Sequence, residues 1–178
     1  MTDEVDAVQD VEGVLLRNLT IWSAGSIIGG GALYAVGRAK GAEAVAAFGR
    51  QNAAWGVVDG VIAGAALASR RRRGEPNPPA KLLAALRFNS VLNVGYVVSG
   101  AGLMLLRDRV VRLQRIPGYT REAALGDGAA IIVQGGYLLV ADAVALRRLF
   151  GEISDGASSI ADGSAVGVPL GAETSAEH

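Results

Sequence analysis

Cysteine is absent from the 178 residues, and the only histidine is His178. Disulfides, thiolate metal sites and cysteine nucleophiles are therefore excluded, and a haem, a zinc site or a histidine general base finds no residue inside the folded region. Aromatic residues make up only 5% of the chain, whereas glycine occurs 25 times and 51% of the residues are hydrophobic. This composition is not typical of a soluble core. We therefore expect no enzyme, no catalytic residues, no metal site and no cofactor.

Charge is missing, or nearly missing, from four long stretches. They comprise residues 18–37, 51–69, 88–106 and 128–146. As helices rising about 1.5 Å per residue, each would reach roughly 30 Å, the thickness of the hydrocarbon core of a bilayer. The sequence predicts an all-α fold, a four-helix transmembrane bundle, within residues 12–150. An Ala/Gly-rich soluble four-helix bundle is the alternative, and the length of the stretches argues against it.

The segments outside the four stretches have other compositions. Residues 1–11 are acidic and are expected to form a flexible N-terminus. Residues 151–178 are small and polar without a sustained period, which predicts a disordered tail. The second and third stretches are separated by four arginines, Arg70, Arg71, Arg72 and Arg73, and by a proline-rich linker. We interpret the arginines as an anchor beside anionic lipid headgroups and expect no nucleic-acid contact, because no aromatic residues are interleaved with them.

Basic residues are almost balanced between the two sides of such a bundle. Nine lie on the side of the termini and of the 70–87 loop, and eight lie on the other side. The positive-inside rule is therefore nearly silent. The density of the arginine run favours cytoplasmic termini for a multi-pass protein of the inner or plasma membrane. A balanced count also permits both orientations, as in small transporters that work as antiparallel dimers.

Glycines recur in the first two stretches at the four-residue spacing that places them on one helix face. Lipid tails are as apolar as leucine, so close backbone approach at small residues must help to hold membrane helices together. The expected packing glycines are Gly25, Gly29, Gly56, Gly60 and Gly64. We expect these seams inside the bundle, and a homodimer seam is the alternative.

A carboxylate, Asp59, lies near the middle of the second stretch. Its charge would cost at least roughly 2.5 kcal/mol at mid-bilayer, so it is expected to face the bundle interior or a wet cavity. The third and fourth stretches also carry polar residues at helical spacing. The predicted polar core consists of Asn52, Asp59, Asn89, Asn93, Tyr96, Gln134, Tyr137 and Asp142.

Two functions compete for that core. In the first, the polar side chains tie the helices together, and the protein is a structural or accessory membrane component with lipid, a second copy or an unidentified membrane protein as partner. In the second, Asp59 carries a proton or cation through a small transporter or channel that works as a dimer. An intramembrane enzyme is not expected, because no nucleophile or metal set can be identified.

Several positions also carry a resemblance to known proteins. These are Asn89 to Tyr96, Gln134-Gly135 with Asp142, Trp22 with Gly29, and Asn52 with Trp55-Gly56. At these positions the chain resembles small bacterial four-helix membrane proteins classed as a domain of unknown function, over roughly residues 15–150. The resemblance implies the four-helix membrane fold and carries no activity with it.

Overall fold

The computed structural model describes residues 2–73, 78–114 and 117–164. Its elements are α1 (Thr2–Lys40), α2 (Glu43–Arg73), α3 (Pro79–Leu105), α4 (Arg107–Gln114) and α5 (Arg121–Ser164). Helices account for all the regular structure in these ranges, which confirms the predicted all-α class. The short helix α4 is separate from α3, because the chain bends at Leu106, whose amide donates to the carbonyl of Gly102 at 2.8 Å.

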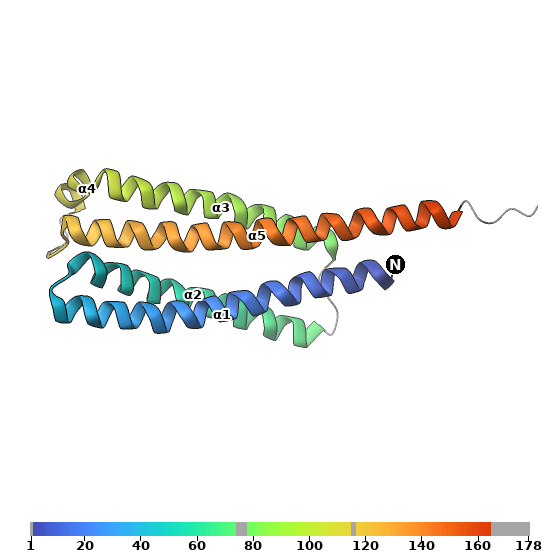
Figure 1. Ribbon diagram of the computed structural model, residues 1–178, viewed down its shortest axis with the longest axis horizontal. Helices are drawn as coiled ribbons and strands as arrows, with labels where there is room; N and C mark the ends of the chain where they lie inside the picture. Colours follow the sequence, from blue (N-terminus) through green and yellow to red (C-terminus); the bar gives the residue numbers. More distant parts are fainter. Residues whose placement is uncertain (1, 74–77, 115–116, 165–178) are drawn as a thin grey trace, which may run out of the picture.

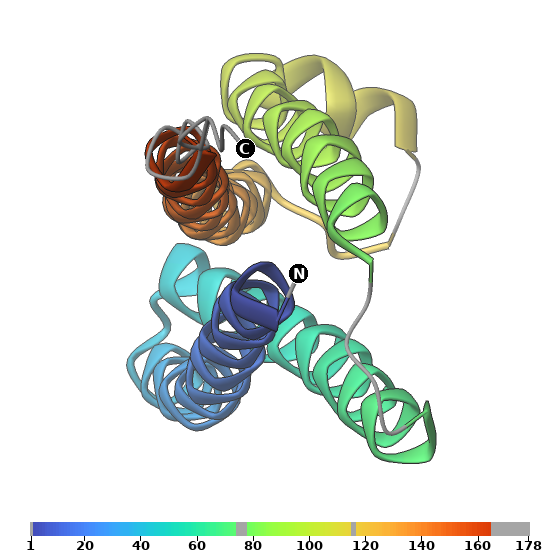
Figure 2. The ribbon, with the colours of Figure 1, turned by 90° about the vertical axis from the view of Figure 1, so that its right-hand side faces the viewer.

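The four long helices run along a common direction (Figure 1). α1 and α2 form one antiparallel pair, and α3 and α5 form another (Figure 2). α5 also packs against α2 and, less extensively, against α1. Within the described ranges, α2 and α3 do not pack against each other. The bundle is therefore open on the side between these two helices.

Each long helix contains a segment whose length and composition suffice to cross a membrane. The segments are Gln9–Lys40, Glu43–Arg73, Ala80–Leu105 and Arg121–Gly151. Three of them enclose a predicted span, and the third predicted span extends one residue past its helix. Four candidate spans thus follow from the low charge of the sequence and from the helical structure together.

The turn between α1 and α2 is made possible by one glycine. Gly41 has a φ of 65°, a conformation that side chains with a Cβ rarely adopt. Its neighbour Ala42 donates its amide to the carbonyl of Gly37 at 2.9 Å, and the Gly41 amide donates to the carbonyl of Arg38. This pair of bonds is a Schellman motif, which ends α1 and lets α2 return beside it.

The first and last long helices extend beyond residues 12–150 at both ends. α1 begins at Thr2, within the expected flexible segment 1–11. α5 continues to Ser164, within the expected disordered tail from 151, and residues 165–178 lie outside the described ranges. At these ends Val11 and Leu149 are buried in one apolar cluster with Leu82 and Leu86. Once a helix is formed, each further residue gains a backbone hydrogen bond, so the helices extend past this cluster.

Candidate polar core and inter-helix cavity

Polar side chains are buried inside this structure while large apolar ones face outward. The buried polar set comprises Glu12, Ser23, Ser26, Asp59, Asn93, Asp127, Gln134 and Asp142. Ile28 is 74% exposed and Val91 is 71% exposed. A soluble domain has the opposite arrangement, because water favours polar groups at the surface.

Gln134 on α5 joins three helices through its amide. Its Oε1 accepts a hydrogen bond from the indole Nε1 of Trp22 on α1. Its Nε2 donates to Ser26 Oγ at 3.2 Å and to Asn52 Oδ1 at 2.9 Å. The amide therefore uses both its acceptor and its donors on partners from α1 and α2, and the side chain is only 3% exposed.

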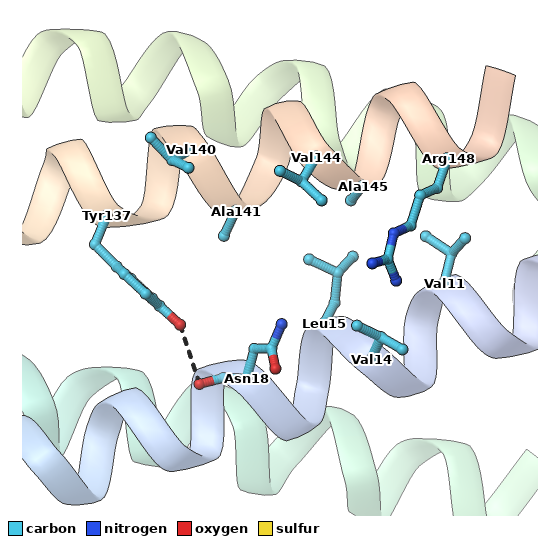
Figure 3. A pocket seen from close by; sticks show the side chains of 10 residues that line it. All are labelled: Val11, Val14, Leu15, Asn18, Tyr137, Val140, Ala141, Val144, Ala145 and Arg148. Atoms are coloured by element: carbon cyan, nitrogen blue, oxygen red, sulfur yellow. Dashed lines mark hydrogen bonds between the residues drawn. The ribbon is translucent and has the colours of Figure 1, made fainter. Parts of the chain in front are cut away.

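Tyr137 lies one turn further along α5 and completes the contact with α1. Its ring stacks on Trp22 with centroids 3.8 Å apart and planes 8° from parallel. Its hydroxyl donates to the carbonyl of Asn18 at 3.3 Å (Figure 3). Beside this bond a hollow of about 210 Å³ separates α1 from α5, and Arg148 lines it at the end away from Tyr137 (Figure 3).

Two further hydrogen bonds join α1 to α2 and α3 to α5. Ser23 on α1 donates to the carbonyl of Gly56 on α2 at 2.7 Å. Asn93 on α3 donates to Asp142 Oδ2 on α5 at 2.9 Å. Each helix of the bundle is thus reached by at least one buried polar bond from another helix.

Only part of the predicted glycine seam lies at a helix contact. A Cβ on Gly56 would lie within 3.0 Å of the α1 backbone, and one on Gly60 would meet Ser23 Oγ at 2.7 Å. A Cβ on Gly25, Gly29 or Gly64 would meet no described atom within 4 Å, so these three glycines lie at no close helix contact among the described residues. The four-residue period repeats along a helix, but the crossing of a second helix covers only part of it.

Other glycines make the close approaches that the periodicity did not reveal. Gly30 and Gly49 face each other across the α1–α2 contact, and a Cβ on either would overlap the other's carbonyl oxygen. Gly126 on α5 lies against the Ala44 carbonyl of α2. Gly100 and Gly128 meet in the same way between α3 and α5.

Asp59 lines a cavity of about 380 Å³, whose lining residues come from α1, α2, α3 and α5. The residue is 3% exposed, and its Oδ2 has no hydrogen-bond partner among the described residues. The same holds for the indole Nε1 of Trp55, one helical turn away. The ring of Trp55 packs edge-on against Tyr96, with centroids 5.0 Å apart. Asp142 and Asn93 line the cavity from α5 and α3, and the exposed Asn89 lines it near the surface.

The structure divides the predicted polar core into two groups. Asn52, Gln134 and Tyr137 belong to the paired network between α1, α2 and α5, although Tyr137 also lines the cavity. The cavity collects the remaining five predicted residues: Asp59, Asn89, Asn93, Tyr96 and Asp142. Ser23, Ser26 and Glu12 were missed, although serines three residues apart in an apolar helix indicate one polar face.

A third polar cluster lies where α4 is connected to α5. Arg50 on α2 donates to both carboxylate oxygens of Asp127, at 3.0 and 2.8 Å. The hydroxyl of Tyr119 donates to Asp127 Oδ2 at 3.1 Å. Burial, assisted by the negative charge of Asp127, raises the pKa of Tyr119 to about 12. The sequence did not predict the pairing of Arg50 with Asp127, because it joins residues 77 positions apart.

Comparison with known proteins identifies a family for the chain but no activity. No curated protein and no solved structure matches the chain. A family model described as a family of unknown function, DUF6992, matches residues 18–143, a range that contains the Gln134 network and the Asp59 and Asp142 carboxylates. The predicted resemblance to a domain of unknown function is thereby confirmed, and the chain belongs to the DUF6992 family.

Proposed function

We propose that this chain is a multi-pass membrane protein in which α1, α2, α3 and α5 cross the bilayer as a transmembrane bundle. The reversed distribution of polarity carries the proposal. Valines and isoleucines cover the outside, and amides and carboxylates lie within. A contiguous apolar exterior of this kind suits lipid, and the buried polar groups suit helices that must pair without a hydrophobic driving force. The exposed arginines 71–73 at the end of α2 would then lie at the headgroups.

We propose that the protein serves as a structural or accessory component of its membrane and is not an enzyme. The Gln134 amide and the Asn93–Asp142 pair support this role, because each polar group binds a partner on another helix. Side chains engaged in this way are positioned to hold helices. The partner would be a second copy of the chain or another membrane protein.

Alkaline carbonate extraction tests the membrane placement. The expressed chain should remain in the membrane pellet at high pH and enter the soluble fraction only with detergent, because four apolar helices cannot leave lipid for water. Release by carbonate alone would show that the exterior is covered by protein rather than by lipid.

A second candidate is a small proton- or cation-coupled transporter acting as a dimer, and the unpartnered Asp59 Oδ2 favours it. Liposomes containing the purified chain and a trapped pH dye distinguish the two functions. A transporter should dissipate an imposed proton or cation gradient, and Asp59→Asn should abolish that flux. A structural component should leave the gradient as stable as in empty liposomes.

A further inference from the structure

The cavity around Asp59 differs from the other polar sites because one oxygen of this carboxylate, Oδ2, has no hydrogen-bond partner in the part of the chain that the structure describes. Its described lining includes the carboxyl-bearing residues Glu12, Asp59 and Asp142 but no arginine, lysine or histidine. Asp142 accepts a hydrogen bond from Asn93, whereas Asp59 Oδ2 accepts none from the described residues. A buried carboxylate oxygen without a partner is costly in a low-dielectric interior, so a ligand that donates to it has a strong advantage.

The shape of the cavity argues for an organic ligand. Its volume of about 380 Å³ lies within the range of small-molecule pockets, roughly 300 to 1,000 Å³. A bare inorganic cation would leave most of this space empty. The described residues also contain no group of three or more histidine, cysteine, aspartate or glutamate side chains close enough to hold a metal ion.

The chemistry of the lining specifies the two ends of that ligand. Around Asp59, the rings of Trp55 and Tyr96 line the cavity, and the face of an aromatic ring attracts a cationic group. Away from it, Leu82, Leu86 and Ala66 provide an apolar surface. The absence of any basic side chain from the described lining disfavours phosphate and carboxylate groups, which the carboxyl-bearing residues of the cavity would repel.

We propose that this cavity binds an amphipathic organic amine, with its ammonium group on Asp59 and its hydrocarbon part along α3. The amine reaches the cavity from the lipid between α2 and α3, the two neighbouring long helices that do not pack together (Figure 2). This inference rests on the membrane placement proposed above and goes beyond it by naming a ligand class.

Tryptophan fluorescence gives a direct readout, since the chain contains two tryptophans and only Trp55 lines the cavity. In a Trp22→Phe background reconstituted in lipid nanodiscs, titration with octylamine at neutral pH should shift the Trp55 emission saturably. Octanol, the neutral analogue, should give no saturable change. Asp59→Asn should weaken octylamine binding by roughly tenfold or more, because the ammonium loses the carboxylate oxygen that no described residue engages.

Two further variants keep the test decisive if Asp59→Asn disturbs folding. Ala66→Leu fills the apolar part of the cavity and leaves Asp59 in place, so it should also weaken octylamine binding. Asp108→Asn removes a carboxylate outside the cavity, on α4, and should leave binding unchanged. Equal responses to octylamine and octanol, or wild-type binding in both cavity variants, would overturn the inference. Release of the chain into the soluble fraction by carbonate would instead overturn the membrane placement. The failure of the ligand proposal and the failure of the membrane placement are therefore distinguishable.

Discussion

At the scale of single residues, Gln134 has the most polar partners on other helices. Its amide contacts Trp22, Ser26 and Asn52, so one side chain links α5 to both helices of the α1–α2 pair. An amide is suited to this position because it offers donors and an acceptor without a charge. An ionised carboxylate at position 134 could not replace the amide, because it has no N–H group to donate to Ser26 and Asn52.

Replacing Gln134 by leucine should therefore lower the free energy of unfolding. Interhelical hydrogen bonds in membrane proteins contribute about 0.6 kcal/mol each on average, so the loss of three should cost roughly 1 to 3 kcal/mol. Denaturation in mixed micelles measures this difference. Ser99→Ala is the matched control, because the exposed Ser99 hydroxyl donates only to Gly95 of its own helix. A Gln134→Leu variant as stable as the control would contradict the role of the network.

Tyr119 should make stability depend on pH in the alkaline range. Burial raises the pKa of its phenol from the ordinary 10.0 to about 12, so the folded state favours the neutral form. The corresponding stability is fully present below pH 10 and is lost as the pH rises from 10 towards 12. The melting temperature of Tyr119→Phe should fall less steeply over this window than that of the wild type. Parallel pH profiles of the two proteins would show that Tyr119 is not the group responsible.

At the scale of helices, close contact depends on a few glycines. The α1–α2 pair meets at Gly30 and Gly49, where added Cβ atoms would overlap the opposite backbone. The α2–α5 contact uses Gly126, and the α3–α5 contact uses Gly100 with Gly128. In lipid no hydrophobic effect drives helix association. Glycine has no side chain, so at these positions the two backbones can approach closely and gain van der Waals contact.

Two adjacent glycines of α1 offer a test of this packing. Gly30→Ala should destabilise the bundle by about 1 to 3 kcal/mol, since its Cβ would lie 2.6 Å from the Ala53 nitrogen and neither backbone can yield without a shift. Gly29→Ala, one residue earlier, should leave stability unchanged or raise it, because its Cβ meets no described atom within 4 Å. Thermal unfolding, monitored by size-exclusion chromatography, gives the melting temperatures of the two variants. Equal melting temperatures would refute the proposed contact.

At the scale of the whole molecule, the four long helices create two distinct ends. The C-terminus of α2 and the N-terminus of α3 lie at one end, and the α1–α2 turn and α4 lie at the other (Figure 1). Basic residues occur at both ends in nearly equal number, so charge alone favours neither orientation strongly.

The absence of native cysteine makes this arrangement measurable with an impermeant maleimide. Arg72→Cys, at the end of α2, and Asp108→Cys, in α4, place exposed thiols at opposite ends. In sealed right-side-out vesicles only the α4 thiol should react if the termini are cytoplasmic, and permeabilisation should expose the other. Partial labelling of both would indicate dual orientation, and labelling of Arg72→Cys alone would reverse the predicted topology.

How far the polar core could be predicted differs from residue to residue. The charge-free surroundings of Asp59 and the four-residue spacing of Asn89 and Asn93 indicated an interior face. Asn93 is indeed buried, but Asn89 is exposed, although both residues line the cavity. For Gly25 and Gly56 the local pattern was equally favourable, yet only Gly56 meets a neighbouring helix. Local spacing identifies a face, and it does not specify where along that face a second helix crosses.

The sequence by itself determined the all-α class and the four long apolar helices, because helix formation and low charge are properties of contiguous residues. It also indicated some of the polar residues that are buried inside the bundle, namely Asp59, Asn93, Gln134 and Asp142. Only the tertiary structure decided that Gln134 is fully engaged whereas Asp59 Oδ2 is left unpaired beside a cavity. Those outcomes depend on the rotation and spacing of helices that are distant in the chain, and the divergence of α2 from α3 is set by how both pack on α1 and α5.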